Sequence, residues 1–159
     1  MNVNKGLEMK VNTFLGVDPG LSGAIAIIKG DDVQVFDCPE TIPEMAAIVK
    51  LYKDNSKVLI EKVNAFYKSS AKSAFTFGSN FGAWQAIFAS FQIPYEFITP
   101  RQWQKQMFDS AKKVEDTKRQ SFERAMRLYP NIELKTKRGK ILDGRCDALL
   151  LATLNYKTK

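Results

Sequence analysis

The chain has 159 residues, of which 45% are hydrophobic and 26% charged, so it is long enough to bury a core without disulfides or structural metals. The absence of histidine excludes histidine-based acid–base catalysis, and two cysteines without CxxC spacing argue against zinc and fit a reducing compartment. No apolar run approaches the length of a membrane span, and the polar extension over residues 1–12 lacks a signal core, so we expect a cytoplasmic protein.

The formal net charge of +7 is unevenly distributed along the chain. Residues 1–99 contain nine Lys and Arg against ten Asp and Glu, whereas residues 100–159 contain fifteen against seven. Such asymmetry indicates a surface that binds a polyanion. A basic surface that only keeps the protein soluble is the alternative. We favour nucleic acid as the partner because the basic residues crowd around one candidate catalytic acid.

The first part of the chain predicts an antiparallel meander, then a helix and a fourth strand. Short apolar runs joined by tight turns indicate strands over 13–18, 23–29 and 32–37. Apolar residues at helical spacing predict a helix over 43–52, and the β-branched run 57–63 predicts the fourth strand. A polar and aromatic loop follows over 64–70.

The second part predicts one more strand among helices. Residues 71–91 indicate a long buried helix, 95–98 a fifth strand, and Thr99-Pro100 the start of another helix. A basic amphipathic helix over 115–129, with Phe122, Ala125, Met126 and Tyr129 inward, leads through a basic loop over 131–140 to an apolar helix over 141–156. Together the elements predict an α/β fold: a mixed five-stranded sheet flanked by helices, in one domain over 13–159.

Four acids stand out at the ends of these elements. Asp18 ends the first strand at a Pro-Gly turn, and Glu61 ends the otherwise apolar fourth strand. Asp143 and Asp147 are four residues apart, hence on one face of the last helix. With the first and fourth strands side by side, the four carboxylates converge, and their charges then require divalent cations. Carboxylate ligands favour Mg²⁺ or Mn²⁺, and a pair of such ions suits cleavage of a phosphodiester.

Each acid also has a structural explanation. Asp18 forms a turn in any case, Asp143 suits a helix N-terminus, and Asp147 has Arg145 or a lysine as a potential partner. Glu61 is the hardest to explain structurally, because a charge in an apolar strand is costly without a partner or a function. The four explanations together are less economical than one metal centre.

Three acidic blocks resemble those of RuvC-type Holliday junction resolvases, in particular the phage-like branch. The blocks are Gly16-Val17-Asp18-Pro19-Gly20, Leu59-Ile60-Glu61-Lys62-Val63 and Asp143-Gly144-Arg145-Cys146-Asp147-Ala148-Leu149-Leu150-Leu151-Ala152. Phe77-Gly78 and Pro100-Arg101-Gln102-Trp103 resemble shorter blocks of that branch, so the resemblance spans about 13–156. It implies a ribonuclease H-like fold, Mg²⁺-dependent cleavage of branched DNA, and a homodimer without a small-molecule cofactor.

The resemblance carries over to particular residues. Asp18, Glu61 and Asp147 match the metal-binding acids of the family. The bacterial pattern has its remaining acid at the position of Gly144, whereas the phage-like pattern supplies Asp143. Lys118 matches one functional lysine of the family. A second functional lysine of the family falls on the position of Gln104, one residue before Lys105. The family has an aromatic residue that stacks on DNA bases, and its position here is occupied by Asn64. We expect Phe66 or Tyr67 to take this role instead.

The basic residues fit a role in holding phosphates beside the acids. The predicted DNA-binding set comprises Phe66, Tyr67, Lys105, Lys112, Lys113, Lys118, Arg119, Lys135, Lys137, Arg138, Lys140 and Arg145. No base-reading motif is present, so we expect recognition of DNA structure with weak sequence preference. Paired nicks in a twofold-symmetric junction require two active sites, hence a dimer. Residues 78–91, with Trp84, Phe88 and Phe91, are either its interface or part of the core.

The predicted reaction is resolution of four-way junctions by paired symmetrical nicks that leave 5′-phosphate and 3′-hydroxyl ends. It would use two Mg²⁺ per active site, with Mn²⁺ as a substitute, bound by Asp18, Glu61, Asp143 and Asp147. Actin-like ATPases and sugar kinases share an Asp-x-Gly turn, but need more chain than 159 residues. A broader branched-DNA or RNA–DNA hybrid nuclease of the same fold, and a non-catalytic DNA-binding relative, are the remaining alternatives.

Overall fold

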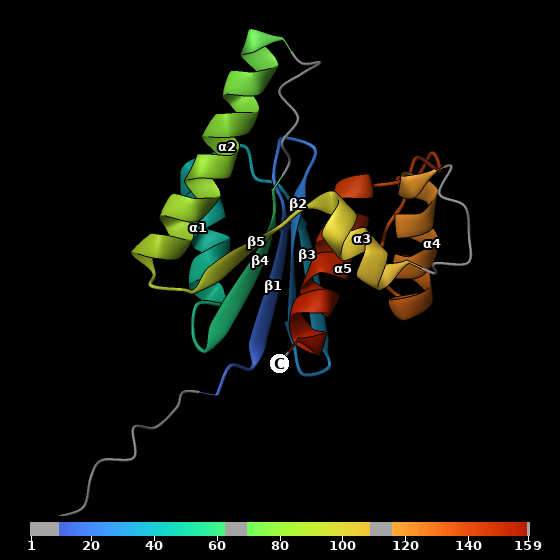
Figure 1. Ribbon diagram of the computed structural model, residues 1–159, viewed down its shortest axis with the longest axis horizontal. Helices are drawn as coiled ribbons and strands as arrows, with labels where there is room; N and C mark the ends of the chain where they lie inside the picture. Colours follow the sequence, from blue (N-terminus) through green and yellow to red (C-terminus); the bar gives the residue numbers. More distant parts are fainter. Residues whose placement is uncertain (1–9, 63–69, 109–115, 159) are drawn as a thin grey trace, which may run out of the picture.

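The structure, a computed structural model, describes residues 10–62, 70–108 and 116–158 and contains one five-stranded sheet with helices on both sides (Figure 1). The strands are β1 Thr13–Asp18, β2 Ala24–Lys29, β3 Asp32–Asp37, β4 Ser56–Glu61 and β5 Tyr95–Ile98. The helices are α1 Ile42–Leu51, α2 Ala71–Ser90, α3 Pro100–Met107, α4 Thr117–Leu128 and α5 Asp143–Lys157. The predicted α/β class and five-stranded mixed sheet are confirmed.

The strand order is β3-β2-β1-β4-β5. β1, β2 and β3 form the predicted antiparallel meander, whereas β4 pairs parallel to β1 and β5 parallel to β4. The prediction that the first and fourth strands are neighbours is therefore confirmed. Since β1 and β4 run in the same direction, with Val17 opposite Ile60, the acids that end the two strands lie at the same edge of the sheet.

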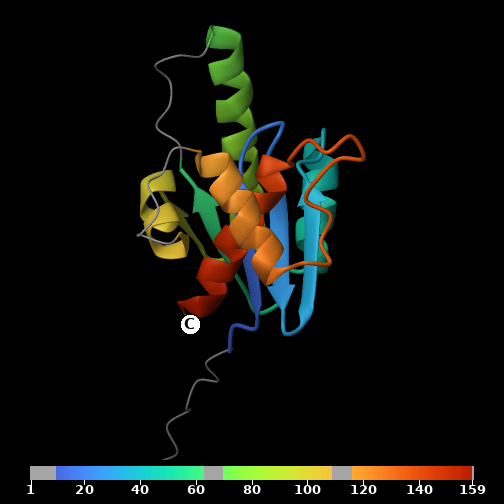
Figure 2. The ribbon, with the colours of Figure 1, turned by 90° about the vertical axis from the view of Figure 1, so that its right-hand side faces the viewer.

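The two faces of the sheet carry different helices. Leu15 and Val17 of β1 point toward α1 and α2, whereas Phe14 packs in the core formed with α3, α4 and α5. Figure 1 shows the two groups of helices on opposite sides, and Figure 2 shows α4 lying over α5. α5 is apolar on nearly all sides because it is enclosed between the sheet and α4.

Helix starts follow the expected capping chemistry. Thr41 with Glu44 and Thr99 with Gln102 form capping boxes at α1 and α3, and the Asp116 side chain caps α4. Most boundaries lie within one or two residues of the predicted ones. The last helix begins at Asp143 rather than at residue 141, because Ile141 forms a β-bridge with Lys135 and the Leu142 N–H donates to the Leu134 carbonyl oxygen.

The aromatic residues of α2 divide between core and surface. Trp84 and Phe88 are fully buried against the sheet, so core packing, rather than a subunit contact, explains these two side chains. Phe91 is partly buried against the same core. Phe75 is 77% exposed, and both views show the N-terminal half of α2 projecting past the sheet (Figures 1 and 2). None of the described helices has the length and apolar character that crossing a membrane requires.

Candidate metal centre

The four predicted acids come from three elements that meet at one edge of the sheet. Asp18 and Glu61 end the adjacent parallel strands β1 and β4, and α5 packs across β1 with Asp143 and Asp147 in its first turns. Two glycines allow this close approach. A Cβ at Gly16 would overlap the α5 backbone at Ala152, and a Cβ at Gly144 would overlap the carbonyl oxygen of Ser22.

The acids interact electrostatically, as their pKa values indicate. Burial raises the pKa of Asp18 well above its usual value, and the charges of Glu61, Asp147 and Asp143 raise it further. Burial likewise raises the pKa of Glu61, which is 6% exposed. The pKa of Asp147 reaches about 7, chiefly through burial and then through Glu61 and Asp143, although a hydrogen bond from Ser121 opposes the rise. Ionising the whole group requires compensating positive charge.

Asp147 supplies the clearest indication of a ligand. Its Oδ1 is buried and has no hydrogen-bond partner among the described residues. Arg145, one of its suggested partners, instead donates to both carboxylate oxygens of Asp37, at 2.7 and 2.9 Å, and to the Glu133 carbonyl oxygen at 3.0 Å. A buried, unpartnered carboxylate oxygen is costly unless something binds it.

Glu61 and Asp143 each have one oxygen held by a protein partner. Glu61 Oε2 accepts a hydrogen bond of 2.5 Å from Trp103 Nε1, and Asp143 Oδ2 forms an ion pair of 2.6 Å with Lys118 Nζ. In this arrangement no three acidic or cysteine side chains of the described residues surround a single cation position. The donor set still fits Mg²⁺ or Mn²⁺, because it consists of carboxylate oxygens and includes the unpartnered Asp147 Oδ1.

The turn after Asp18 is attached to α2 by one buried side chain. Asn80 Oδ1 accepts from the Gly20 N–H at 2.8 Å, and Asn80 Nδ2 donates to Cys38 Sγ at 3.1 Å. Gly20 has a φ of 118°, which favours glycine, and the Gly23 N–H closes the turn onto its carbonyl oxygen. This contact holds the backbone two residues beyond Asp18 in place.

The basic residues form several different arrangements. Lys118 contacts Asp143 directly, and the positive charge of Lys140 also helps to lower the pKa of Asp143. Lys137 and Arg138 are exposed in the turn between Lys135 and Ile141. The remaining basic side chains of this group have partners: Arg119 pairs with Glu123, Lys135 lies 4.4 Å above the ring of Phe122, and Arg145 pairs with Asp37.

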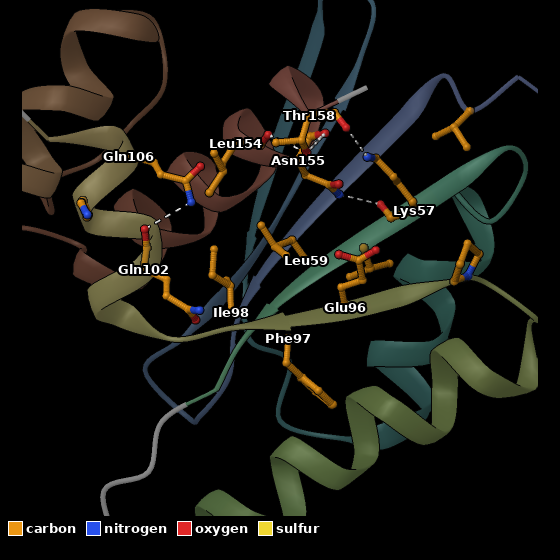
Figure 3. A pocket seen from close by; sticks show the side chains of 14 residues that line it. Lys57, Leu59, Glu96, Phe97, Ile98, Gln102, Gln106, Leu154, Asn155 and Thr158 are labelled. Carbon is orange, nitrogen blue, oxygen red and sulfur yellow. Dashed lines mark hydrogen bonds between the residues drawn. The ribbon is translucent and has the colours of Figure 1, made fainter.

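Lys105 lies in a different place. It lines a cavity of about 780 Å³ between α3 and α5, together with Lys57, Leu59 and Asn155, and none of the four acids lines it (Figure 3). The predicted DNA contacts Phe66, Tyr67, Lys112 and Lys113 lie outside the described residues. The roles predicted for all these residues remain predictions.

Three residues that contact the site were not predicted to do so: Trp103, Asn80 and Ser121. Trp103 belongs to a block quoted for its family resemblance, but nothing in the sequence pairs it with Glu61, 42 residues away. Asn80 is a polar residue within an aromatic and small-residue helix, a pattern that indicates a buried polar contact without naming its partner. Ser121 lies one turn into α4 and has no comparable signal.

Comparisons with known proteins identify the fold. No family model and no curated protein sequence matches the chain. Among solved structures, it is similar to Thermus thermophilus RuvC in complex with a Holliday junction substrate, at 15% identity and TM-score 0.56, covering 88% of this chain and 89% of that one. Another Thermus thermophilus RuvC structure matches at 16% identity and TM-score 0.56, with 88% and 90% covered.

The yeast mitochondrial Holliday junction resolvase Ydc2 is similar at 11% identity and TM-score 0.54, covering 91% of this chain and 77% of that one. The chain therefore has the fold of RuvC-type resolvases, which confirms the predicted ribonuclease H-like architecture. At these identities the likeness establishes the fold, and the activity has to be argued from the site.

Proposed function

We propose that this protein is a metal-dependent endodeoxyribonuclease that resolves four-way DNA junctions by paired symmetrical nicks. The observation that carries the proposal is the group of four coupled acids at the ends of β1, β4 and α5, with the buried Asp147 Oδ1 unpartnered. The similar structures, two of Thermus thermophilus RuvC and one of a yeast mitochondrial resolvase, support this substrate class. The excess of basic residues over 100–159 supports binding of nucleic acid.

In the proposed mechanism, Asp18, Glu61, Asp143 and Asp147 hold two Mg²⁺ ions, with Mn²⁺ as a substitute. When bound, the ions would supply an activated water and charge stabilisation at the leaving oxygen. Lys118 neutralises Asp143 in the metal-free protein, and at 72% side-chain exposure it is available to a phosphate once a cation takes its place. Cleavage would leave 5′-phosphate and 3′-hydroxyl ends.

The homodimer belongs to the same proposal, because paired nicks in a symmetric junction require two active sites. With Trp84 and Phe88 in the core, the face of α2 left for a subunit contact contains the exposed Phe75, Gly78 and Gly82. Nothing described lies within 4 Å of a Cβ placed at either glycine, so that face leaves room for close approach by a second helix.

The decisive test compares a labelled four-way junction with linear duplex and an RNA–DNA hybrid, in Mg²⁺ and in EDTA. We expect symmetrical nicks in the junction only, and only with metal. Asp18→Asn should abolish cleavage while leaving junction binding within about twofold, because removing one ligand removes the chemistry and leaves the basic surface intact. Asp31→Asn, an exposed acid in the β2–β3 turn, is the matched control and should cleave normally.

Other outcomes separate the alternatives. Equal cleavage of junction, duplex and hybrid would contradict junction resolution and indicate a broader nuclease of this fold. Tight junction binding without cleavage in Mg²⁺ or in Mn²⁺ would indicate a non-catalytic relative. Loss of both binding and fold in Asp18→Asn would instead assign that acid a structural role.

A further inference from the structure

One buried side chain donates directly to a candidate metal ligand. Trp103 is 0% exposed, and its indole N–H donates to Glu61 Oε2 at 2.5 Å. No second hydrogen bond reaches this carboxylate from the described part of the chain. One oxygen of Glu61 is therefore held by the protein, which leaves the other for a ligand at the sheet edge.

The position of the indole is well determined by its surroundings. Ile98 lies opposite Glu61 in the β4–β5 register, and the Lys62 N–H donates to the Ile98 carbonyl oxygen. α3 starts immediately after β5, with Thr99 as its cap, so only a short, hydrogen-bonded connection separates Trp103 from the end of the sheet. Phe108 meets the indole edge-on at a centroid distance of 5.5 Å, which restricts rotation of the ring.

We propose that Trp103 is a positioning residue that orients Glu61 for metal binding. The inference rests on the proposed metal-dependent function. An indole N–H is only a donor, so at this carboxylate it acts by fixing the accepting oxygen in place. It carries no charge, so it does not compete with a cation, unlike the Lys118 ammonium at Asp143.

The chain contains a matched control for this role. Trp84 is also 0% exposed, but it lies in the core on the opposite face of the sheet. Its indole nitrogen has no oxygen or nitrogen acceptor among the described residues. Replacing either tryptophan by phenylalanine removes a buried indole, and only the replacement at 103 removes a hydrogen bond to an acid of the site.

The experiment measures Mn²⁺ and Ca²⁺ binding by calorimetry in the absence of DNA, on the full chain. Trp103→Phe should weaken metal binding about tenfold, the size typical for loss of a group that orients a ligand, whereas Trp84→Phe should leave it within about twofold. Circular dichroism and melting temperature monitor the fold. If Trp103→Phe does not fold, β-(3-benzothienyl)alanine at position 103 retains the bicyclic shape and lacks only the N–H.

A second background tests whether Trp103 acts through Glu61. In Glu61→Gln, the added change Trp103→Phe should cause no further loss of metal affinity. Wild-type affinity in Trp103→Phe, or an equal loss in both backgrounds, would overturn the inference. Wild-type protein that binds Mn²⁺ but leaves junctions intact would contradict the proposed function and leave this inference standing. Absence of Mn²⁺ binding by the wild type would overturn both.

Discussion

At the scale of single residues, Asp147 and Asp143 show how environment separates two acids on one helix face. Burial raises the pKa of Asp147 to about 7, and its Oδ1 is unpartnered among the described residues. The pKa of Asp143 is lowered despite its burial penalty, because Lys118 pairs with it. The two acids should therefore affect the stability of the metal-free protein in opposite directions.

For Asp147, the folded-state pKa lies above its ordinary value of 3.8. Between about pH 4 and 7 the folded protein keeps this proton while the unfolded chain releases it, so the free energy of unfolding falls as pH rises. The full difference is on the order of 4 kcal/mol. In EDTA, Asp147→Asn should flatten this fall and unfold at higher urea than wild type at pH 8. Urea melts of both proteins from pH 4 to 8 measure how the free energy of unfolding changes with pH.

In the same urea melts, Asp143→Asn should change stability in the opposite direction from Asp147→Asn. Because the Asp143 pKa is lowered, its charged form stabilises the fold at neutral pH, and this variant should be less stable than wild type at pH 8. The loss should be small, since Lys118 is mostly exposed. A pH slope in Asp147→Asn equal to that of wild type would show that the Asp147 carboxyl does not contribute to the fall in stability.

At the scale of elements, the contact between α5 and β1 determines which positions of α5 can carry an acid. Gly144 packs against the backbone of Ser22 and Gly23, so no side chain fits at this position. The bacterial resolvase pattern has an acid there, and in this chain the acid is at Asp143, one position earlier. The preceding residue Leu142 leaves α5 without a side-chain cap, and Asp143 is the acid in its first turn.

Gly144→Ala should therefore disturb both stability and metal binding. The added methyl group overlaps backbone atoms, which cannot rotate away, so α5 must shift from β1 at a cost of about 2–3 kcal/mol. We expect a lower urea midpoint and weaker Mn²⁺ binding, because the α5 acids move relative to Asp18. Urea melts and calorimetry on the same preparation measure both effects.

Gly82→Ala in α2 is the control for this change. Within one subunit a Cβ there meets nothing described within 4 Å, so replacing a glycine within a helix should raise the free energy of unfolding of the monomer by about 0.5–1 kcal/mol. Its metal affinity should remain that of wild type. Equal stability changes in the two variants would refute the proposed close contact at Gly144.

At the scale of the whole molecule, patterns local in sequence predicted most of the fold. Short apolar runs joined by tight turns predicted the strands, and the expected pairing of β1 with β4 is confirmed, which brings the acids that end them to one sheet edge. Contacts between residues far apart in the sequence could not be predicted. Asn80 meets Gly20 across 60 positions and Trp103 meets Glu61 across 42, and in each case a single polar atom makes the contact. The spacing of apolar residues along the chain contains no information about such a pair.

The residues of the predicted basic surface also differ in whether the protein already supplies them with a partner. Arg145 and Arg119 are occupied by acids, and Lys135 covers an aromatic ring, whereas Lys137 and Arg138 are exposed and have no ion pair among the described residues. These two lie in the same turn as Lys140, whose charge acts on Asp143. If the acids act on DNA as proposed, Lys137 and Arg138 are free to contact a flanking phosphate.

The double variant Lys137→Glu/Arg138→Glu should therefore weaken junction binding about tenfold at low salt and reduce the slope of log affinity against log salt by up to about two, the value for two lost phosphate contacts. Lys29→Glu/Lys50→Glu makes the same change in net charge at exposed positions away from the acids, since Lys29 ends β2 at the opposite edge and Lys50 lies on α1. Its slope should match that of wild type. Fluorescence anisotropy with labelled junction, over a salt range of about 50 to 300 mM, measures the affinity of both variants. An equal loss of affinity in the two would mean that net charge, rather than this turn, attracts the DNA.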